Sequence, residues 1–121
     1  MSLDEIREEI TGRRDDQSKN GQVMQLAKER LREELRKPNG RVVWEATSLR
    51  SDFRSMVLGL GYDYHAATRL VCFPCDPDEL LSRNRSRKHA IPTSVLQKQL
   101  DSLEWPEACE AHLVETCFVL E

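Results

Sequence analysis

The region between residues 41 and 73 constrains the fold most, because strand and helix signals alternate along it. The short apolar run at 41–44 is typical of a buried strand, and residues 51–60 carry apolar side chains at helical spacing. Residues 68–73 are again typical of a strand, and a last strand is expected at 113–120. Strands that are separated by helices pair in parallel through right-handed crossovers. We therefore predict an α/β fold with a short parallel sheet of three strands and flanking helices.

Local signals predict the remaining helices. A capping box at residues 2–5 precedes the first helix, which we expect to end near Gly12. Apolar side chains at nearly 3.6-residue spacing predict a long helix at 21–36. A capping aspartate, Asp76, is followed by proline and predicts the start of another helix. A final helix is expected after Pro92.

Length and composition limit the class of protein. With 121 residues the chain has the length of one small domain, and we assign residues 1–121 to a single domain. A formal net charge of −3 argues against a globally basic nucleic-acid binder, although residues 83–88 form a local basic run. The first 20 residues are charged and polar, no apolar run reaches membrane length, and the four cysteines form no spaced framework. These features predict a cytoplasmic protein without a membrane partner.

Two polar segments indicate a reaction class. Residues 45–50 form a polar elbow that follows the first predicted strand and begins with Glu45, and a crowded arginine run lies at 83–88. An acidic group at a strand end and arginines on a mobile helix are groups that phosphoryl transfer uses to position and neutralise its reactants. The phosphate-binding motif GxxxxGK[ST] does not occur in the sequence, so no phosphate cradle is encoded. We therefore expect the chain to be inactive alone in such a reaction.

These segments, taken in order, resemble parts of the polynucleotide 5′-kinase family of P-loop phosphotransferases, in the form of the bacterial RNA-repair kinase module. The resemblance runs from about Ser2 to His112. It implies an incomplete P-loop kinase fold, of which this chain would be the acceptor-binding and lid portion. Glu45 and Ser48 stand where the family usually has Asp and Asn. The segments that carry the resemblance are 4–7, 45–49, 83–87 with 91–92, 104–106 and 110–112.

The resemblance implies that Asp4 and Arg7 act on the acceptor. Asp4 would accept the proton of the attacking 5′-hydroxyl, as a catalytic base. Arg7 would grip the phosphate beside that hydroxyl through its guanidinium fork. A structural interpretation also exists, in which Asp4 is an acid favoured in the first turn of a helix and Arg7 forms an exposed i,i+3 pair with it.

Four further residues are implied on the lid and at the elbow. Arg87 would reach over the transferring phosphates as the catalytic lid arginine, and Arg83 would support the nucleotide site. Their spacing of four residues predicts a shared helix face, although a basic last turn would also complement the helix C-terminus. Thr47 and Arg50 would line the acceptor site just past the strand end. Alternatively, Thr47 caps the next helix and Arg50 is solvated.

The resemblance also implies cofactors and partners. ATP and Mg²⁺ would be the cofactors once a P-loop segment is supplied, and the acceptor would be a 5′-hydroxyl end of RNA or DNA. Loss of a central strand would expose strand edges and apolar surface, so we expect a homodimer or completion by another polypeptide. The alternative function is a non-catalytic remnant that acts as a protein or nucleic-acid interaction module.

The cysteines raise a separate question about metal binding. Cys72 and Cys75 form a CxxC pair, and Cys109 with His112 forms a CxxH pair, which together would make a four-ligand zinc site. Cys72 lies within a predicted strand, where a cysteine packs as a small apolar side chain. Pro74 disfavours the turn that such a site needs. We therefore predict no metal site.

Overall fold

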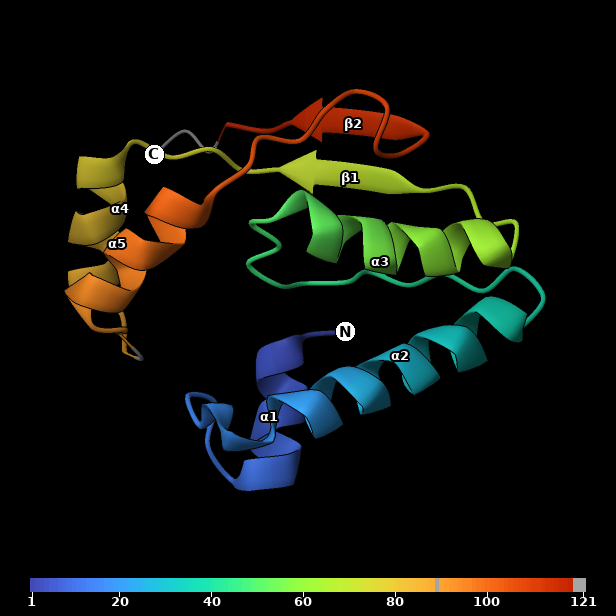
Figure 1. The fold of residues 1–121 in the computed structure, drawn as a ribbon, viewed down its shortest axis with the longest axis horizontal. Coiled ribbons are helices and arrows are strands. Elements are labelled where there is room, and N and C mark those ends of the chain that lie inside the picture. The colour runs from blue at the N-terminus through green and yellow to red at the C-terminus, as the bar shows by residue number, and fades with distance from the viewer. Residues whose placement is uncertain (89, 119–121) are drawn as a thin grey trace. The chain divides into compact units, whose positions relative to one another are not determined.

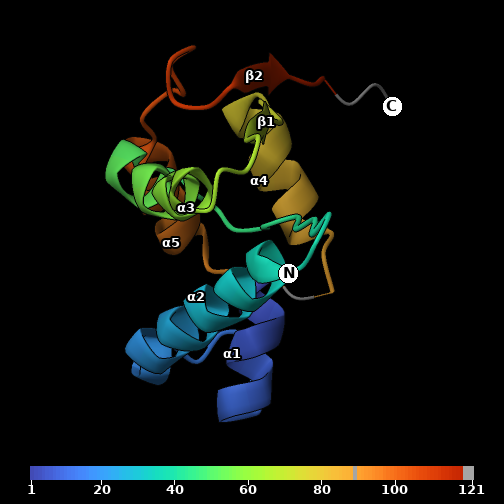
Figure 2. The ribbon, with the colours of Figure 1, turned by 90° about the vertical axis from the view of Figure 1, so that its right-hand side faces the viewer.

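The computed structural model describes residues 1–88 and 90–118, which form an α/β protein of helices and a parallel sheet (Figures 1 and 2). The chain divides into two compact units, which are described separately. Unit 1 comprises Met1–Thr47 and Gly59–Ala66, and unit 2 comprises Ser48–Leu58 and Ala67–Glu121. Helix α3 (Ser51–Asp63) contributes its start to unit 2 and its end to unit 1. The assignment of the whole chain to one domain stays a prediction.

Unit 1 is built on two helices, α1 (Leu3–Thr11) and α2 (Asn20–Arg36), which pack side by side in both ribbon views (Figures 1 and 2). A short 3-10 helix, η1 (Gln17–Lys19), joins them. Gly12 ends α1 as expected, because its φ of 82° lies in the left-handed region and its N–H donates to the Glu8 carbonyl. The apolar spacing predicted for α2 is confirmed by the core of the unit, which contains Leu3, Ile6, Val23, Ala27 and Leu31.

Charged and aromatic contacts orient the helices of unit 1. Arg30 of α2 makes two hydrogen bonds to the carboxylate of Glu9 in α1, with N···O distances of 3.2 and 2.7 Å. At the other end of α2, the guanidinium of Arg36 lies 5.7 Å from the ring centroid of Tyr64. Both contacts are at the surface, where ion pairs contribute little to stability. The apolar core is therefore the main source of stability in this unit.

The predicted strand at 41–44 is not formed. Glu45 makes a single parallel bridge with Ser2, in which the Glu45 N–H donates to the Met1 carbonyl at 2.8 Å. A strand needs a hydrogen-bonding neighbour along its length, and the segment that pairs with Glu45 among the described residues turns into α1 at Leu3. Ser2 occupies the N-cap position of α1 with the usual extended backbone, but the predicted capping box is not formed, because its side chain makes no capping hydrogen bond.

Unit 2 contains the sheet, which has two strands in the part of the chain that the structure describes. Strands β1 (Arg69–Cys72) and β2 (Leu113–Thr116) run parallel, with Arg69 opposite Leu113 (Figure 1). The expected parallel pairing is therefore confirmed, but the number of strands differs from the three predicted. Residues 119–120 of the last predicted strand lie outside the described residues.

His112 and Thr68 close the starting edge of this sheet. The Thr68 N–H donates to His112 Nδ1 at 3.0 Å, and the His112 N–H donates to Thr68 Oγ1 at 3.1 Å. The first ladder bond follows directly, from the Leu113 N–H to the Thr68 carbonyl at 3.2 Å. Side chains thus extend the backbone pairing by one residue, which sets the register of the two strands.

Two helices complete unit 2, and they contact each other: α4 (Pro77–Arg85) and α5 (Thr93–Ser102). The predicted start of α4 is confirmed, since Asp76 accepts a hydrogen bond from the Asp78 N–H at 2.8 Å and proline occupies the first turn. We call residues 77–102 the lid hairpin. Among the described residues, no helix combines the length and apolar character that crossing a membrane requires.

Candidate functional site

Asp4 and Arg7 lie together on the first turns of α1. Arg7 Nη1 donates to Asp4 Oδ1 at 2.6 Å, which confirms the expected i,i+3 contact. The Asp4 side chain is exposed, whereas that of Arg7 is only 11% exposed. An accessible carboxylate held by a partly buried guanidinium is oriented before any ligand arrives, as a proton acceptor requires.

Arg7 has further acceptors in the segment that joins α1 to α2. Its Nε donates to Asn20 Oδ1 at 3.1 Å, and its Nη1 also donates to the Arg14 carbonyl at 3.3 Å. The guanidinium is therefore fixed from three directions. The structure makes Arg7 the group that holds Asp4 and the interhelical loop, while its expected contact with an acceptor phosphate stays a prediction.

Thr47 and Arg50 lie in the elbow before α3, and both are exposed. The helix begins at Ser51, so Thr47 lies too many residues before the helix to be its cap. The Arg50 carbonyl accepts from the Arg54 N–H at 3.1 Å, and its guanidinium pairs with Asp52 at 3.3 Å. Both side chains are accessible to a ligand. Their expected contact with the acceptor stays a prediction.

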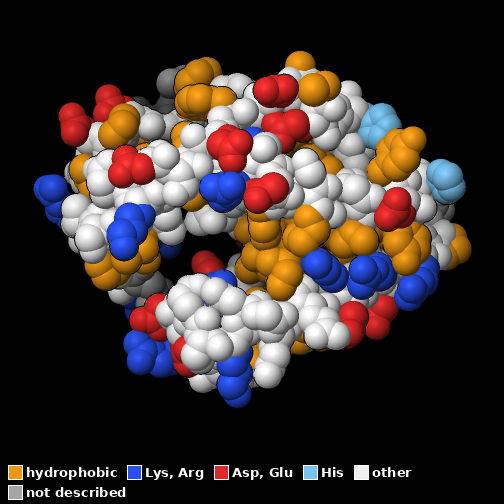
Figure 3. All heavy atoms as spheres, viewed as in Figure 1, with side chains coloured by type: hydrophobic (Ala, Val, Ile, Leu, Met, Phe, Trp, Pro, Cys, Tyr) orange, Lys and Arg blue, Asp and Glu red, His pale blue; other side chains and the backbone are white. Residues whose placement is uncertain are grey.

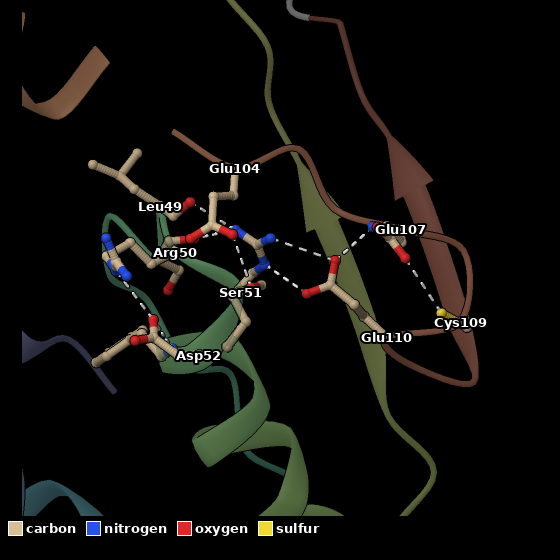
Figure 4. Close-up of polar contacts among 11 residues, drawn as sticks. Leu49, Arg50, Ser51, Asp52, Glu104, Glu107, Cys109 and Glu110 are labelled. Carbon is tan, nitrogen blue, oxygen red and sulfur yellow. Dashed lines mark hydrogen bonds and ion pairs between the residues drawn. The ribbon is translucent and has the colours of Figure 1, made fainter. Parts of the chain in front are cut away.

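The elbow is held by Arg54, which the sequence patterns did not single out. Arg54 is 3% exposed, and its Nη1 donates to the carbonyls of Ser48 and Leu49 at 2.9 and 3.0 Å (Figure 4). Ser48 has a φ of 46°, in the left-handed region that non-glycine residues rarely adopt. The guanidinium thus satisfies two carbonyls of a backbone turn that would otherwise be unfavourable.

The Arg54 guanidinium also pairs with Glu110. Glu110 belongs to the segment that precedes β2 and is labelled in Figure 4. Nε donates to Glu110 Oε1 at 2.9 Å, and Nη2 donates to Oε2 at 3.4 Å, in a bidentate arrangement. Glu110 also accepts from the Glu107 N–H, and the Glu104 N–H donates to the Leu49 carbonyl at 2.8 Å. The elbow and residues 104–110 therefore form one hydrogen-bonded assembly, which we call the elbow clamp.

The clamp makes the stability of unit 2 dependent on pH. The hydrogen bond from Arg54 holds the pKa of Glu110 below its ordinary value of 4.5, with the Glu107 N–H acting in the same direction against the opposing effect of burial. A carboxylate whose pKa is lower in the folded state contributes stability above the unfolded pKa. That contribution is lost as the pH falls through the folded pKa.

We therefore expect Glu110→Gln to reduce stability most at neutral pH, with the deficit shrinking as the pH falls below about 4.5. Denaturant titrations of the wild type and the variant between pH 7 and pH 3 measure this difference. Glu107→Gln is the matched control, because its side chain is exposed and neighbours Glu110 in sequence. A deficit that stays constant with pH would contradict the linkage.

The lid arginines differ in their surroundings. Arg83 lies on α4 and pairs with Glu79 one turn earlier. Arg87 lies beyond the helix, which ends at Arg85, and its side chain is exposed. The expectation that Arg83 and Arg87 share a helix face is therefore wrong, because the helical repeat that would align them stops between them.

The possible metal ligands are not grouped. Within residues 1–88 and 90–118, no three cysteine, histidine or acidic side chains are placed so that they could hold a metal ion. All four cysteine thiols are free, and His112 Nδ1 is engaged by Thr68. A Cys₃His zinc site is therefore not assembled in this structure.

Arg54, Glu110, Asn84 and His112 are the residues whose structural roles sequence reasoning missed. Arg54 could have been found from the sequence, because it lies three residues before Val57 on a helix whose other residues at this spacing are apolar. A charged residue on the apolar face of a helix implies a buried partner. Nothing local identifies that partner as Glu110, which lies 56 positions away.

Comparison with known proteins adds one match. A family model described as an AAA domain matches residues 1–106, which include α1 to α5 and the elbow. A search of curated proteins found no match. The matched span includes Asp4, Arg7, Arg54 and the lid hairpin, and it ends before Glu110.

Proposed function

Since the chain belongs to the AAA-domain family of the P-loop NTPase-like kinase superfamily, we propose that it forms the acceptor-binding and lid part of an ATP-dependent polynucleotide 5′-hydroxyl kinase that acts in nucleic-acid repair. The superfamily includes polynucleotide kinase-like proteins. The kinase-like fold supports the reaction class, and the named residues below support the choice of substrate.

The tip of the lid hairpin is the observation that carries this proposal. Arg85, Arg87 and Lys88 follow one another closely where α4 ends, and all three side chains are exposed. Phosphoryl transfer depends on cations that can approach the transferring phosphates. A helical hairpin that presents exposed cations at its tip suits that task.

In the proposed reaction, the 5′-oxygen of the acceptor attacks the γ-phosphorus of ATP. The new P–O bond forms as the bond from the γ-phosphorus to the β,γ-bridging oxygen breaks, so that ADP leaves and a 5′-phosphate is made. Asp4 takes the proton of the hydroxyl, and Arg7 orients the Asp4 carboxylate and meets the phosphate next to the reactive end. Arg87 neutralises charge on the γ-phosphate, with Arg83 supporting the nucleotide.

The cofactors fit this chain only in part. Exposed arginines at the lid tip fit the phosphates of ATP, and Thr47 and Arg50 at the elbow are accessible to the acceptor. Within the described residues there is no cluster of acidic side chains for a divalent cation. The proposal therefore assigns Mg²⁺ and the phosphate cradle to a P-loop segment that must be supplied.

Binding of a single-stranded oligonucleotide tests the acceptor part directly. We expect the chain to bind a 5′-hydroxyl end more tightly than the same oligonucleotide with a 5′-phosphate, because the Asp4 carboxylate repels the added charge. Fluorescence anisotropy with both oligonucleotides measures the preference, and Asp4→Asn should remove it. Equal binding of the two ends by the wild type would overturn the acceptor assignment.

A second candidate function is a non-catalytic interaction module. It is favoured by apolar side chains that reach the surface of unit 2, among them Phe73 at 63% and Trp105 at 62% exposure. Apolar side chains are visible among the charged ones on the face drawn in Figure 3. Exposed aromatic residues are common at protein interfaces. Phosphate transfer from ATP by the chain with a P-loop segment supplied would favour the kinase over this module.

We also propose that the chain associates with a second copy or with a completing polypeptide. The segment at 41–44 has strand-like composition, Val43 is exposed, and only Glu45 forms a bridge. Unsatisfied strand edges and exposed apolar side chains promote association. Light scattering coupled to size exclusion should give a mass above 14.0 kDa that falls on dilution. A monodisperse monomer that melts cooperatively would contradict the proposal.

A further inference from the structure

Asn84, in the last turn of α4, is a buried polar residue to which the proposed mechanism gives no part. It is 5% exposed, although its neighbour Arg85 is exposed. Burying a carboxamide is unfavourable unless its donor and its acceptor are both hydrogen-bonded. The hydrogen-bond partners of the Asn84 side chain therefore indicate the structural role of this residue.

The carboxamide of Asn84 makes both of its hydrogen bonds to the backbone of Ile91. Nδ2 donates to the Ile91 carbonyl at 2.7 Å, and the Ile91 N–H donates to Oδ1 at 3.1 Å. The side chain thus pairs with Ile91 as the backbone of a neighbouring strand would. The two residues form the neck of a loop at 85–90, which we call the lid loop; its described residues are 85–88 and 90.

The start of the lid loop is tied to the end of α4 as well. The Arg87 N–H donates to the Asn84 carbonyl at 3.2 Å, and the Ser86 N–H donates to the Arg83 carbonyl at 3.2 Å. Arg87 is thus bonded to Asn84 through its backbone, and Asn84 is bonded through its side chain to Ile91. One residue therefore restrains the lid loop at both ends.

We infer that Asn84 is a positioning residue, whose carboxamide closes the lid loop on Ile91 and so presents Arg87 to the phosphates of the nucleotide. The identity of that ligand rests on the proposed function, whereas the closed neck is independent of it. Long arginine side chains lose much rotamer freedom when they bind. A fixed loop backbone lowers the further entropy that binding would remove, and this is the physical advantage of the neck.

Two substitutions distinguish the contributions of the two hydrogen bonds between Asn84 and Ile91. Asn84→Ala removes both hydrogen bonds to Ile91. Asn84→Asp has nearly the same size and keeps an acceptor for the Ile91 N–H, but it places a carboxylate against the Ile91 carbonyl. Ser86→Ala is the matched control, because it removes only a hydroxyl contact to the Ser82 carbonyl within the same turn.

The test combines ATP binding with a double-mutant cycle on the 121-residue chain joined to a supplied P-loop segment, because the proposed function requires that segment to hold ATP. Displacing a catalytic group by about an ångström can cost on the order of a hundredfold in rate. We therefore expect Asn84→Ala to weaken ATP binding about tenfold, and we expect Asn84→Ala/Arg87→Ala to bind no more weakly than Arg87→Ala. Such non-additivity is what a residue acting through Arg87 produces, and a general loss of folding would not produce it. Isothermal titration with ATP measures all four proteins.

Two outcomes would separate this inference from the proposed function. If Arg87→Ala weakens ATP binding but Asn84→Ala does not, or if their effects add, Asn84 is not the positioning residue and the function stands. If ATP binding does not depend on Arg87, the proposed lid function fails, and amide hydrogen exchange decides the inference. Exchange at Ile91 and Arg87 that is unchanged in Asn84→Ala and Asn84→Asp would then overturn it, and faster exchange with Ser86→Ala unaffected would support the closed neck.

Discussion

The Arg54→Met variant is expected to lose about 3–5 kcal/mol of the free energy of unfolding, the usual cost of removing one partner from a buried ion pair. Methionine fills similar space but leaves the Glu110 carboxylate at 11% exposure without its bidentate partner. It also leaves the carbonyls of Ser48 and Leu49 without their donor. The elbow and residues 104–110 should then separate.

Denaturant unfolding followed by circular dichroism measures this loss, and amide exchange in β1 and β2 locates it in unit 2. Arg50→Met is the matched control, because Arg50 is an exposed arginine of the same segment and its loss should change stability by roughly 0.5 kcal/mol or less. The double variant Arg54→Met/Glu110→Met should recover part of the loss, since neither charge is then buried alone. If Arg54→Met were as stable as Arg50→Met, the clamp would have no energetic role.

Asp4→Asn is expected to lower the rate of phosphate transfer by a factor on the order of a hundred to ten thousand, the usual contribution of a positioned general base. Asparagine keeps the size of the side chain and an acceptor for Arg7, so the first turns of α1 should retain their geometry. It cannot accept the proton of the attacking hydroxyl. The loss should therefore appear in kcat, with little change in KM for the oligonucleotide.

This rate needs a protein that holds ATP. A suitable one is a fusion that places a strand, P-loop, helix and strand from another family member before Met1. The parallel bridge between Ser2 and Glu45 supports this design, because a strand that ends at Ser2 would run beside residues 41–45. Glu5→Gln is the control, since Glu5 is an exposed acid in the same helical turn. If both variants transferred phosphate at the wild-type rate, Asp4 would not be the base.

The helices were predictable because their signals are local. Gly12 adopts the left-handed conformation that ends α1, and Asp76 caps α4 within two residues of its own position. The apolar spacing from Val23 to Leu31 gives α2 one buried face with helical periodicity. The contact between Asp4 and Arg7 was predictable for the same reason, since helical geometry brings residues three apart together.

Other expectations failed where they depended on a distant partner. The segment at 41–44 has the composition of a strand, but strand formation needs a neighbour along its whole length, and Glu45 alone finds one in Ser2. The shared face expected for Arg83 and Arg87 required α4 to continue for another turn. The helix ends at Arg85, where Asn84 binds Ile91 instead.

The sequence by itself determined the helices, the glycine that ends α1, the aspartate that caps α4 and the basic composition of the lid, because each depends on residues within about one helical turn. It also carried the order of motifs from which the kinase resemblance followed. Only the tertiary structure decided how the elbow is held, since Arg54 and Glu110 are 56 positions apart. It likewise decided the start of the sheet, where His112 meets Thr68. Burial and hydrogen bonding select such partners in three dimensions, and sequence spacing does not encode them.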